Sequence, residues 1–186
     1  MQLITLKVKE IVKNLFYNEG SELFKDIFEQ HVKRVVKYSK LLAEKLGADI
    51  EICELSAWLH DASKTNSREN HYEKSSKLAE KILKELNYPL NKIEIVKYCI
   101  LAHDKKFNSK RKFIEATIVA NADVIAHFER IPELFYIAYN VLKLNKHKGK
   151  KWIVEKMNNN WKVLMPEAKE LIQDKYDAFN ILISND

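Results

Sequence analysis

The doublet His60–Asp61 is the part of this chain whose residue types point most directly to chemistry. It ends the apolar run from Ala57 to Leu59, and Lys64 follows Asp61 by three residues. Adjacent residues of an α-helix point about 100° apart, so a helix end or the turn after it is needed for both side chains to face one centre. An imidazole and a carboxylate at one centre can bind a metal ion, and a lysine beside them can hold an anion.

Three more histidines and one aspartate have the apolar surroundings that are typical of buried helices. His31 and His103 border apolar runs, and His71 begins a segment with helical spacing. Asp123 lies in the nearly uncharged segment 120–126, where an unpaired carboxylate would be costly to bury. A helical bundle could bring these four side chains to the doublet.

The order His31, His60–Asp61, Asp123 resembles the HD-domain superfamily of metal-dependent phosphohydrolases, which is named after its His-Asp doublet. The resemblance covers roughly residues 29–128, a little over half of the chain. Lys64 also fits, because many members carry a lysine at that position. His71 and His103 stand where members with two metal ions place histidines for the second ion.

The resemblance implies an enzyme that holds one or two divalent ions. Imidazole and carboxylate ligands suit Fe, Mn, Co, Ni or Zn, with Mg²⁺ as a further option. The ligands that the resemblance implies are His31, His60, Asp61 and Asp123 for the first ion, and Asp61 as a bridge with His71 and His103 for the second. Single-metal relatives exist, and a histidine in apolar surroundings is often only a hydrogen-bonded core or surface group.

The expected reaction is the attack of metal-bound hydroxide on a phosphate ester of a nucleotide or another small phosphorylated metabolite. Asp61 and Lys64 are the expected catalytic residues, with Lys64 also binding the substrate phosphate as a point charge. Lys64 could instead simply pair with Asp61 or Glu73. His127, four residues after Asp123 and on the same helix face, could reach substrate, buttress a ligand or pack in the core.

A basic cluster follows His103 directly and could draw phosphate towards the site. Its members are Lys105, Lys106, Lys110, Arg111 and Lys112. Lys105, Lys106 and Arg111 are candidate substrate-binding residues at the rim of the site, although basic runs are most often solvated faces. A nucleic-acid partner is not favoured, because aromatic residues are not interleaved with the cluster as a stacking platform requires.

Composition favours a single all-helical domain of 186 residues with a net charge of +6 and only three glycines and three prolines. Cys53 and Cys99 lie far apart, so neither a disulfide framework nor a thiolate zinc site is expected, and a reducing cytoplasm is the natural compartment. No apolar run approaches the length of about 18 residues needed to span a membrane. Lys7, Lys9 and Glu10 interrupt any signal-peptide core.

Apolar spacing and caps predict an HD-domain-like helical bundle with helical extensions at both ends. The N-terminal helix, through Ile4, Val8 and Leu15, is expected to pack on the domain, with a membrane-surface or partner helix as the alternative. Ser21 and Asp49 are expected to begin helices, and Gly47 to end one. Residues 63–70 are expected to form a loop, and 131–186 a helical extension on a core at about 21–130. Later helices are expected at about 71–86, 91–103, 112–128, 132–146, 150–165 and 166–183.

A rival function from another class is a non-catalytic or regulatory module that keeps the metal cage to bind a nucleotide or RNA. The intact set of ligands together with Lys64 favours the enzyme, because a binding module has no need of an open metal position.

Overall fold

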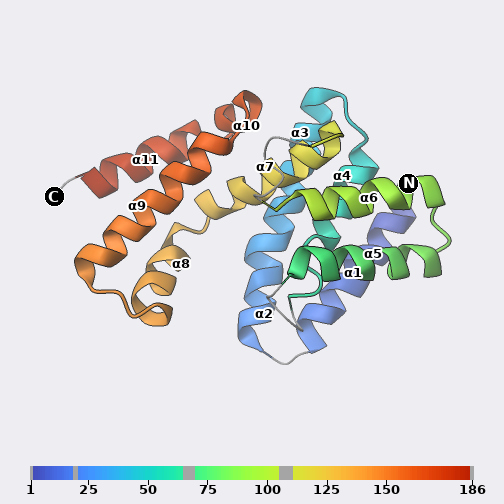
Figure 1. Ribbon diagram of the computed structural model, residues 1–186, viewed down its shortest axis with the longest axis horizontal. Helices are drawn as coiled ribbons and strands as arrows, with labels where there is room; N and C mark the ends of the chain where they lie inside the picture. Colours follow the sequence, from blue (N-terminus) through green and yellow to red (C-terminus); the bar gives the residue numbers. More distant parts are fainter. Residues whose placement is uncertain (1, 19–20, 65–69, 105–110, 185–186) are drawn as a thin grey trace. The chain divides into compact units, whose positions relative to one another are not determined.

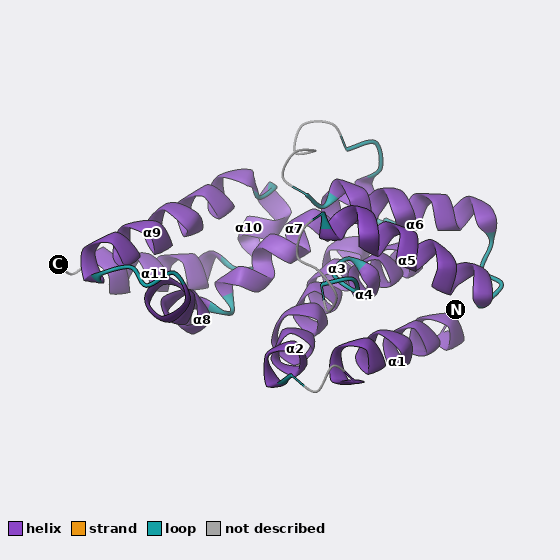
Figure 2. Ribbon diagram, turned by 60° about the horizontal axis from the view of Figure 1, so that its bottom comes forward, coloured by secondary structure: helices purple, strands orange, loops and turns teal. Residues whose placement is uncertain are grey.

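The computed structural model describes residues 2–18, 21–64, 70–104 and 111–184, and every regular element in these ranges is a helix (Figures 1 and 2). The all-α prediction is therefore confirmed. The chain divides into two compact units, Met1–Asp123 and Val124–Asp186. None of the helices in the described ranges combines the length and the hydropathy needed to cross a bilayer.

The first unit contains the residues expected to bind metal. Its helices, in chain order, are α1 (Gln2–Asn18), α2 (Glu22–Asp26), η1 (Ile27–Val32), α3 (Lys33–Leu46), α4 (Ile50–Leu59), α5 (His71–Glu85), α6 (Leu90–Ala102) and the first part of α7 (Ile114–Phe128). Helix α4 packs against α1, α3 and α6, and α5 packs against α6. Most of α4 is buried, including every residue from Leu55 to Leu59, so it is the central helix of this unit.

Helix α1 is amphipathic and belongs to the core of the first unit. Val8, Val12 and Phe16 are fully buried, one helical turn apart, and α1 packs against α2 and α4. The expectation that this helix packs on the domain therefore holds. Ser21 occupies the N-cap position of α2 as expected, although its side chain makes no capping hydrogen bond.

Element η1 is a π-helical turn between α2 and α3, and it carries His31. The backbone N–H of Lys33 donates to the carbonyl of Phe28, five residues back. Phe28 is fully buried, and its ring lies 5.8 Å from that of Trp58 at 23°. The wide turn was not predicted, because apolar spacing does not distinguish it from an α-helix.

Caps at the next two helix ends agree with the sequence. Gly47 ends α3 with φ = 68°, a left-handed conformation that costs glycine little. The side chain of Asp49 accepts a hydrogen bond from the backbone N–H of Ile52 at 3.1 Å and so begins α4. Helix α4 then ends directly before His60, and α6 ends directly before His103.

The second unit is a smaller helical assembly with an apolar and aromatic core. After the end of α7 it contains α8 (Ile131–Tyr136), η3 (Ile137–Val141), α9 (Lys146–Val163), α10 (Pro166–Glu170) and α11 (Gln173–Ser184). Ile153 and Met157 of α9 are fully buried. Trp161 stacks on Tyr176 of α11 with ring centroids 4.0 Å apart.

Two predicted helices of this unit have different bounds. The helix expected at about 132–146 ends at Val141, because Lys143 is left-handed (φ 53°) and Asn145 caps the start of α9. The helix expected at about 166–183 is two helices. The backbone N–H of Ile172 donates to the carbonyl of Lys169, three residues back, and this tight turn separates α10 from α11.

Candidate metal centre

Six imidazole and carboxylate side chains converge inside the first unit. They come from the π-helical turn (His31), the end of α4 (His60 and Asp61), the start of α5 (His71), the end of α6 (His103) and α7 (Asp123). These are the six residues that the sequence analysis proposed as metal ligands. The helix ends matter because residues there escape the 100° spacing that would separate His60 from Asp61.

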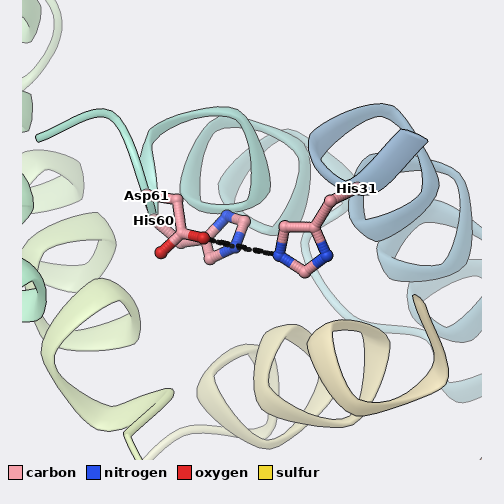
Figure 3. Close-up of side chains that lie close together, drawn as sticks. All are labelled: His31, His60 and Asp61. Carbon is pink, nitrogen blue, oxygen red and sulfur yellow. Dashed lines mark hydrogen bonds and ion pairs between the residues drawn. The ribbon is translucent and has the colours of Figure 1, made fainter. Parts of the chain in front are cut away.

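His31, His60 and Asp61 form what we call the inner group (Figure 3). All three side chains are buried. Asp61 Oδ2 lies 3.4 Å from His31 Nε2 and 3.3 Å from His60 Nε2. The two Nε2 atoms are 3.3 Å apart. Asp123 Oδ1 lies 3.1 Å from His31 Nε2 and so adds a second carboxylate beside this group.

Asp61, His71 and His103 form what we call the outer group. Asp61 Oδ1 lies 3.5 Å from His71 Nε2. This oxygen is buried and has no hydrogen-bond partner among the residues that the structure describes. The rings of His71 and His103 are 5.5 Å apart. Asp61 therefore offers one carboxylate oxygen to each group, Oδ2 to the inner group and Oδ1 to the outer group.

Two of the histidines have their tautomers set by the backbone. His60 Nδ1 lies 2.7 Å from the carbonyl of Ala57, and His103 Nδ1 bonds to the carbonyl of Ile100. A carbonyl only accepts, so each Nδ1 must carry the hydrogen, and the lone pair of the neutral ring is on Nε2. Fixing the second nitrogen in this way is how proteins orient metal-binding histidines.

These donors fit a divalent metal ion. His31 Nε2 faces three groups that can all accept a hydrogen bond, namely Asp61 Oδ2, Asp123 Oδ1 and His60 Nε2. Two carboxylate oxygens and a ring nitrogen around one atom favour positive charge at the centre of this cluster, which a protonated imidazole or a metal ion supplies. Asp61 Oδ1, which is buried and accepts no hydrogen bond from the described residues, likewise favours positive charge in the outer group.

The pKa values show how these charges are balanced. Burial lowers the pKa of His31, but hydrogen bonds to Asp123 and Asp61 outweigh burial and raise it above its ordinary value. Burial raises the pKa of Asp61, yet its neighbours His60, Lys64 and His31 hold it well below its ordinary value. Burial, with help from His60, lowers the pKa of His103 to about 4. Asp61 is thus ionised and His103 neutral near pH 7, the states that bind metal.

Lys64 forms an ion pair with Asp61, which was one of the two pairings expected if it does not bind substrate. Its Nζ lies 2.6 Å from Asp61 Oδ2, and its side chain is 28 % exposed. Arg111 lies at the end of α6, where its Nε donates to the carbonyl of Ala102 at 2.8 Å. Lys105, Lys106 and Lys110 fall outside the described residues.

His127 belongs to the second unit. Its Nδ1 lies 3.5 Å from the side-chain nitrogen of Asn160, which is fully buried. Within this unit His127 is therefore in contact with a core residue, as expected if it packs in the core.

Ser63 and Ser75 were missed by sequence reasoning. Both are buried, and they hydrogen-bond to each other beside the doublet. The available signal was spacing, since Ser75 follows His71 by four residues and so shares its helix face.

Comparison with protein families finds a match to the HD domain over residues 28–127, more than half of the chain. Comparisons with curated proteins and with solved structures find no significant match. The matched segment contains all six residues of the centre, from His31 to Asp123. This chain belongs to the HD-domain family.

Proposed function

We propose that the protein is a metal-dependent phosphohydrolase acting on a nucleotide or another small phosphate ester. HD domains are in general hydrolase-like and typically bind divalent metals. The observation that carries the proposal is the position of Asp61, whose two buried oxygens face two separate sets of histidines. When bound, divalent ions polarise a phosphoryl oxygen and lower the pKa of coordinated water.

In this proposal the inner group together with Asp123 holds one ion. The outer group holds the second, with Asp61 shared between the two. The buried side chains of the inner group fix their atoms by packing, so little reorganisation is needed on binding. Fe, Mn, Co, Ni and Zn suit the ligands best, and Mg²⁺ is weaker with imidazole.

Exposure indicates the side from which substrate approaches. Asp61 and His60 are closed to solvent, at 1 % and 0 % of their side-chain surface, whereas His71 is 20 % and Lys64 28 % exposed. Asp123 is also 20 % exposed, but it carries negative charge, so a phosphate ester would enter beside Lys64 and His71. The Lys64 ammonium would hold the phosphate oxygens there and stabilise negative charge as it develops.

The basic cluster is proposed to act at a greater distance. Arg111 lies beside the end of α6 that precedes His103, and Lys105 and Lys106 follow in sequence. These charges would raise the local concentration of a phosphorylated substrate through their summed field.

The proposal is tested by a substrate screen of the purified protein reconstituted with Mn²⁺, Co²⁺, Ni²⁺ or Zn²⁺. The panel contains nucleoside mono-, di- and triphosphates, cyclic and linear nucleotide diesters, and bis-p-nitrophenyl phosphate. We expect hydrolysis that requires metal and disappears in Asp61→Asn. Stoichiometric metal binding without turnover of any ester would contradict the enzyme and favour the non-catalytic nucleotide- or RNA-binding module.

A further inference from the structure

Two buried serines connect the turn that carries Asp61 to the helix that carries His71. The backbone N–H of Ser63 donates to Ser75 Oγ at 3.1 Å, and Ser63 Oγ donates to the carbonyl of His71 at 2.9 Å. The two hydroxyl oxygens are 2.9 Å apart. Ser63 follows Asp61 by two residues, and Ser75 lies one helical turn after His71 on α5.

The direction of each hydrogen bond follows from counting hydrogens. A carbonyl only accepts, so the single hydroxyl hydrogen of Ser63 is committed to His71. Ser75 must then donate its own hydrogen to Ser63 Oγ, while its oxygen accepts from the Ser63 N–H. Each hydroxyl thus donates once and accepts once, and the network is complete without water.

This network reaches the outer group through both of its ends, Asp61 and His71, but the inner group only through Asp61. His71 is the first residue of α5, and its carbonyl is one of the bonded atoms. Ser75 shares the helix face of His71, so holding Ser75 against the turn also turns the imidazole towards Asp61. The inner-group side chains come from η1 and the end of α4, and no part of α5 carries them.

We propose that Ser63 and Ser75 are positioning residues for the second metal ion, because they hold His71 Nε2 at 3.5 Å from Asp61 Oδ1. This inference rests on the proposed two-ion site. It predicts that the two ions respond differently to loss of one hydroxyl. Losing a group that orients a metal ligand typically weakens metal affinity about 10- to 100-fold.

The experiment is a titration of the metal-depleted protein with Mn²⁺, followed by calorimetry and by electron paramagnetic resonance. We expect two Mn²⁺ in the natural protein, with the spin-coupled signal of a close pair. In Ser75→Ala the dissociation constant of the second Mn²⁺ should rise about 10- to 100-fold. That of the first should stay within about threefold, and the signal should become that of isolated Mn²⁺.

Ser76→Ala is the matched control. Ser76 is the next residue on α5 and is also buried, but its hydroxyl bonds to the carbonyl of Lys97 on α6. It loses the same hydroxyl from the same helix, so any general weakening of α5 affects both variants. We expect Ser76→Ala to bind both ions as the natural protein does.

Ser63→Ala is the second test, and it decides the question if Ser75→Ala does not fold. Two Mn²⁺ bound equally well by the serine variants and by Ser76→Ala would overturn the positioning role and leave the two-ion site intact. Loss of both ions together would also overturn it, because the pair would then support the whole centre. A natural protein that binds only one Mn²⁺ would overturn the two-ion site itself, and this inference with it.

Discussion

The inner and outer groups share Asp61 but are held in different ways. The inner group consists of buried side chains on a π-helical turn and at the end of the central helix. In the outer group, His71 is one-fifth exposed and stands at the first residue of its helix, where the serine pair connects it to the doublet. In the proposed site, core packing would therefore position the first ion and local hydrogen bonds the second. The second ion should be the easier one to lose.

The substitution with the largest expected effect removes the negative charge of Asp61, the residue that the two groups share. Asp61→Asn keeps the shape of the side chain but removes the charge that faces both sets of histidines. We expect metal content to fall below about a tenth of an equivalent and hydrolysis to disappear, because the outer group loses its carboxylate and the inner group keeps only that of Asp123 beside it. Elemental analysis and an esterase assay measure this.

Asp104→Asn is the control for that variant, since it makes the same change beside His103 but outside both groups. It should keep both ions. Far-UV circular dichroism should show the same helical content in both variants. Retention of activity within about tenfold in Asp61→Asn, a loss near 1.4 kcal/mol, would exclude the shared role.

The next largest effect separates the groups from each other. His71→Gln should keep about one equivalent of metal, because the inner group is intact. His60→Gln should lose the inner ion and reduce kcat by more than His71→Gln, since it removes a fully buried ligand whose orientation is set by the Ala57 carbonyl. Equal metal loss in the two variants would show that the groups are one cooperative site.

A smaller effect is expected for the charges on the substrate side. Lys64→Ala should lower kcat by about tenfold or more while changing KM less, because its ammonium lies next to the shared carboxylate. Neutralising Arg111 and Lys112 should instead raise KM a few-fold and flatten its dependence on salt, since rim charges act through a screened field. Both variants are compared with the natural protein by steady-state kinetics at low and high salt. An unchanged KM and salt slope in the second variant would leave that cluster as a solvated face.

The smallest effect concerns stability with metal removed by a chelator. His103 has a lowered pKa, so the unfolded chain binds more protons than the folded one below its ordinary value of 6.5, and stability falls as pH drops towards about 4. His31 has a raised pKa, so its contribution is complete below 6.5 and is lost as pH rises through the raised value. The Tm measured in chelator should therefore be highest near pH 6.5.

Single-residue variants show which histidine causes the loss of Tm on each side of the pH optimum. His31→Gln should flatten the alkaline side, and His103→Gln the acidic side down to about pH 4. Asp61 changes the profile only at the acidic end, because its lowered pKa adds stability that is complete at higher pH and is lost as pH falls below 3.8. Each kcal/mol corresponds to about 2–4 °C in a chain of this size. A profile that the two histidine variants leave unchanged would contradict these charge assignments.

Much of the centre could be predicted because helix caps and apolar runs in the sequence indicate where the helices that carry its residues begin and end. Gly47 and Asp49 mark the ends of helices in any fold, and the apolar run before His60 implies a helix that ends at the doublet. The resemblance then gave the order of the other candidate ligands along the chain, and their role as metal ligands stays a prediction. The all-helical fold followed from the same caps and spacing.

Other features depend on tertiary contacts that a single sequence does not display. The pairing of Ser63 with Ser75 joins two elements across a segment whose sequence is simply polar. The choice of Lys64 between Asp61 and Glu73 depends on the direction of the turn after α4. The break before α11 places Ile172 in the core of the second unit, which local helical spacing does not reveal.

The π-helical turn makes the centre sensitive to chain length as well as to residue type. One extra residue is accommodated between α2 and α3, where the N–H of Lys33 reaches back to Phe28. Deleting a single residue from Ile27–Val32 would restore the α-helical phase and rotate everything before the deletion by about 100° relative to everything after it. Phe28 and His31 could then no longer face the core and the metal centre together. Substitutions here alter one side chain, whereas an insertion or deletion changes the register of the whole helix.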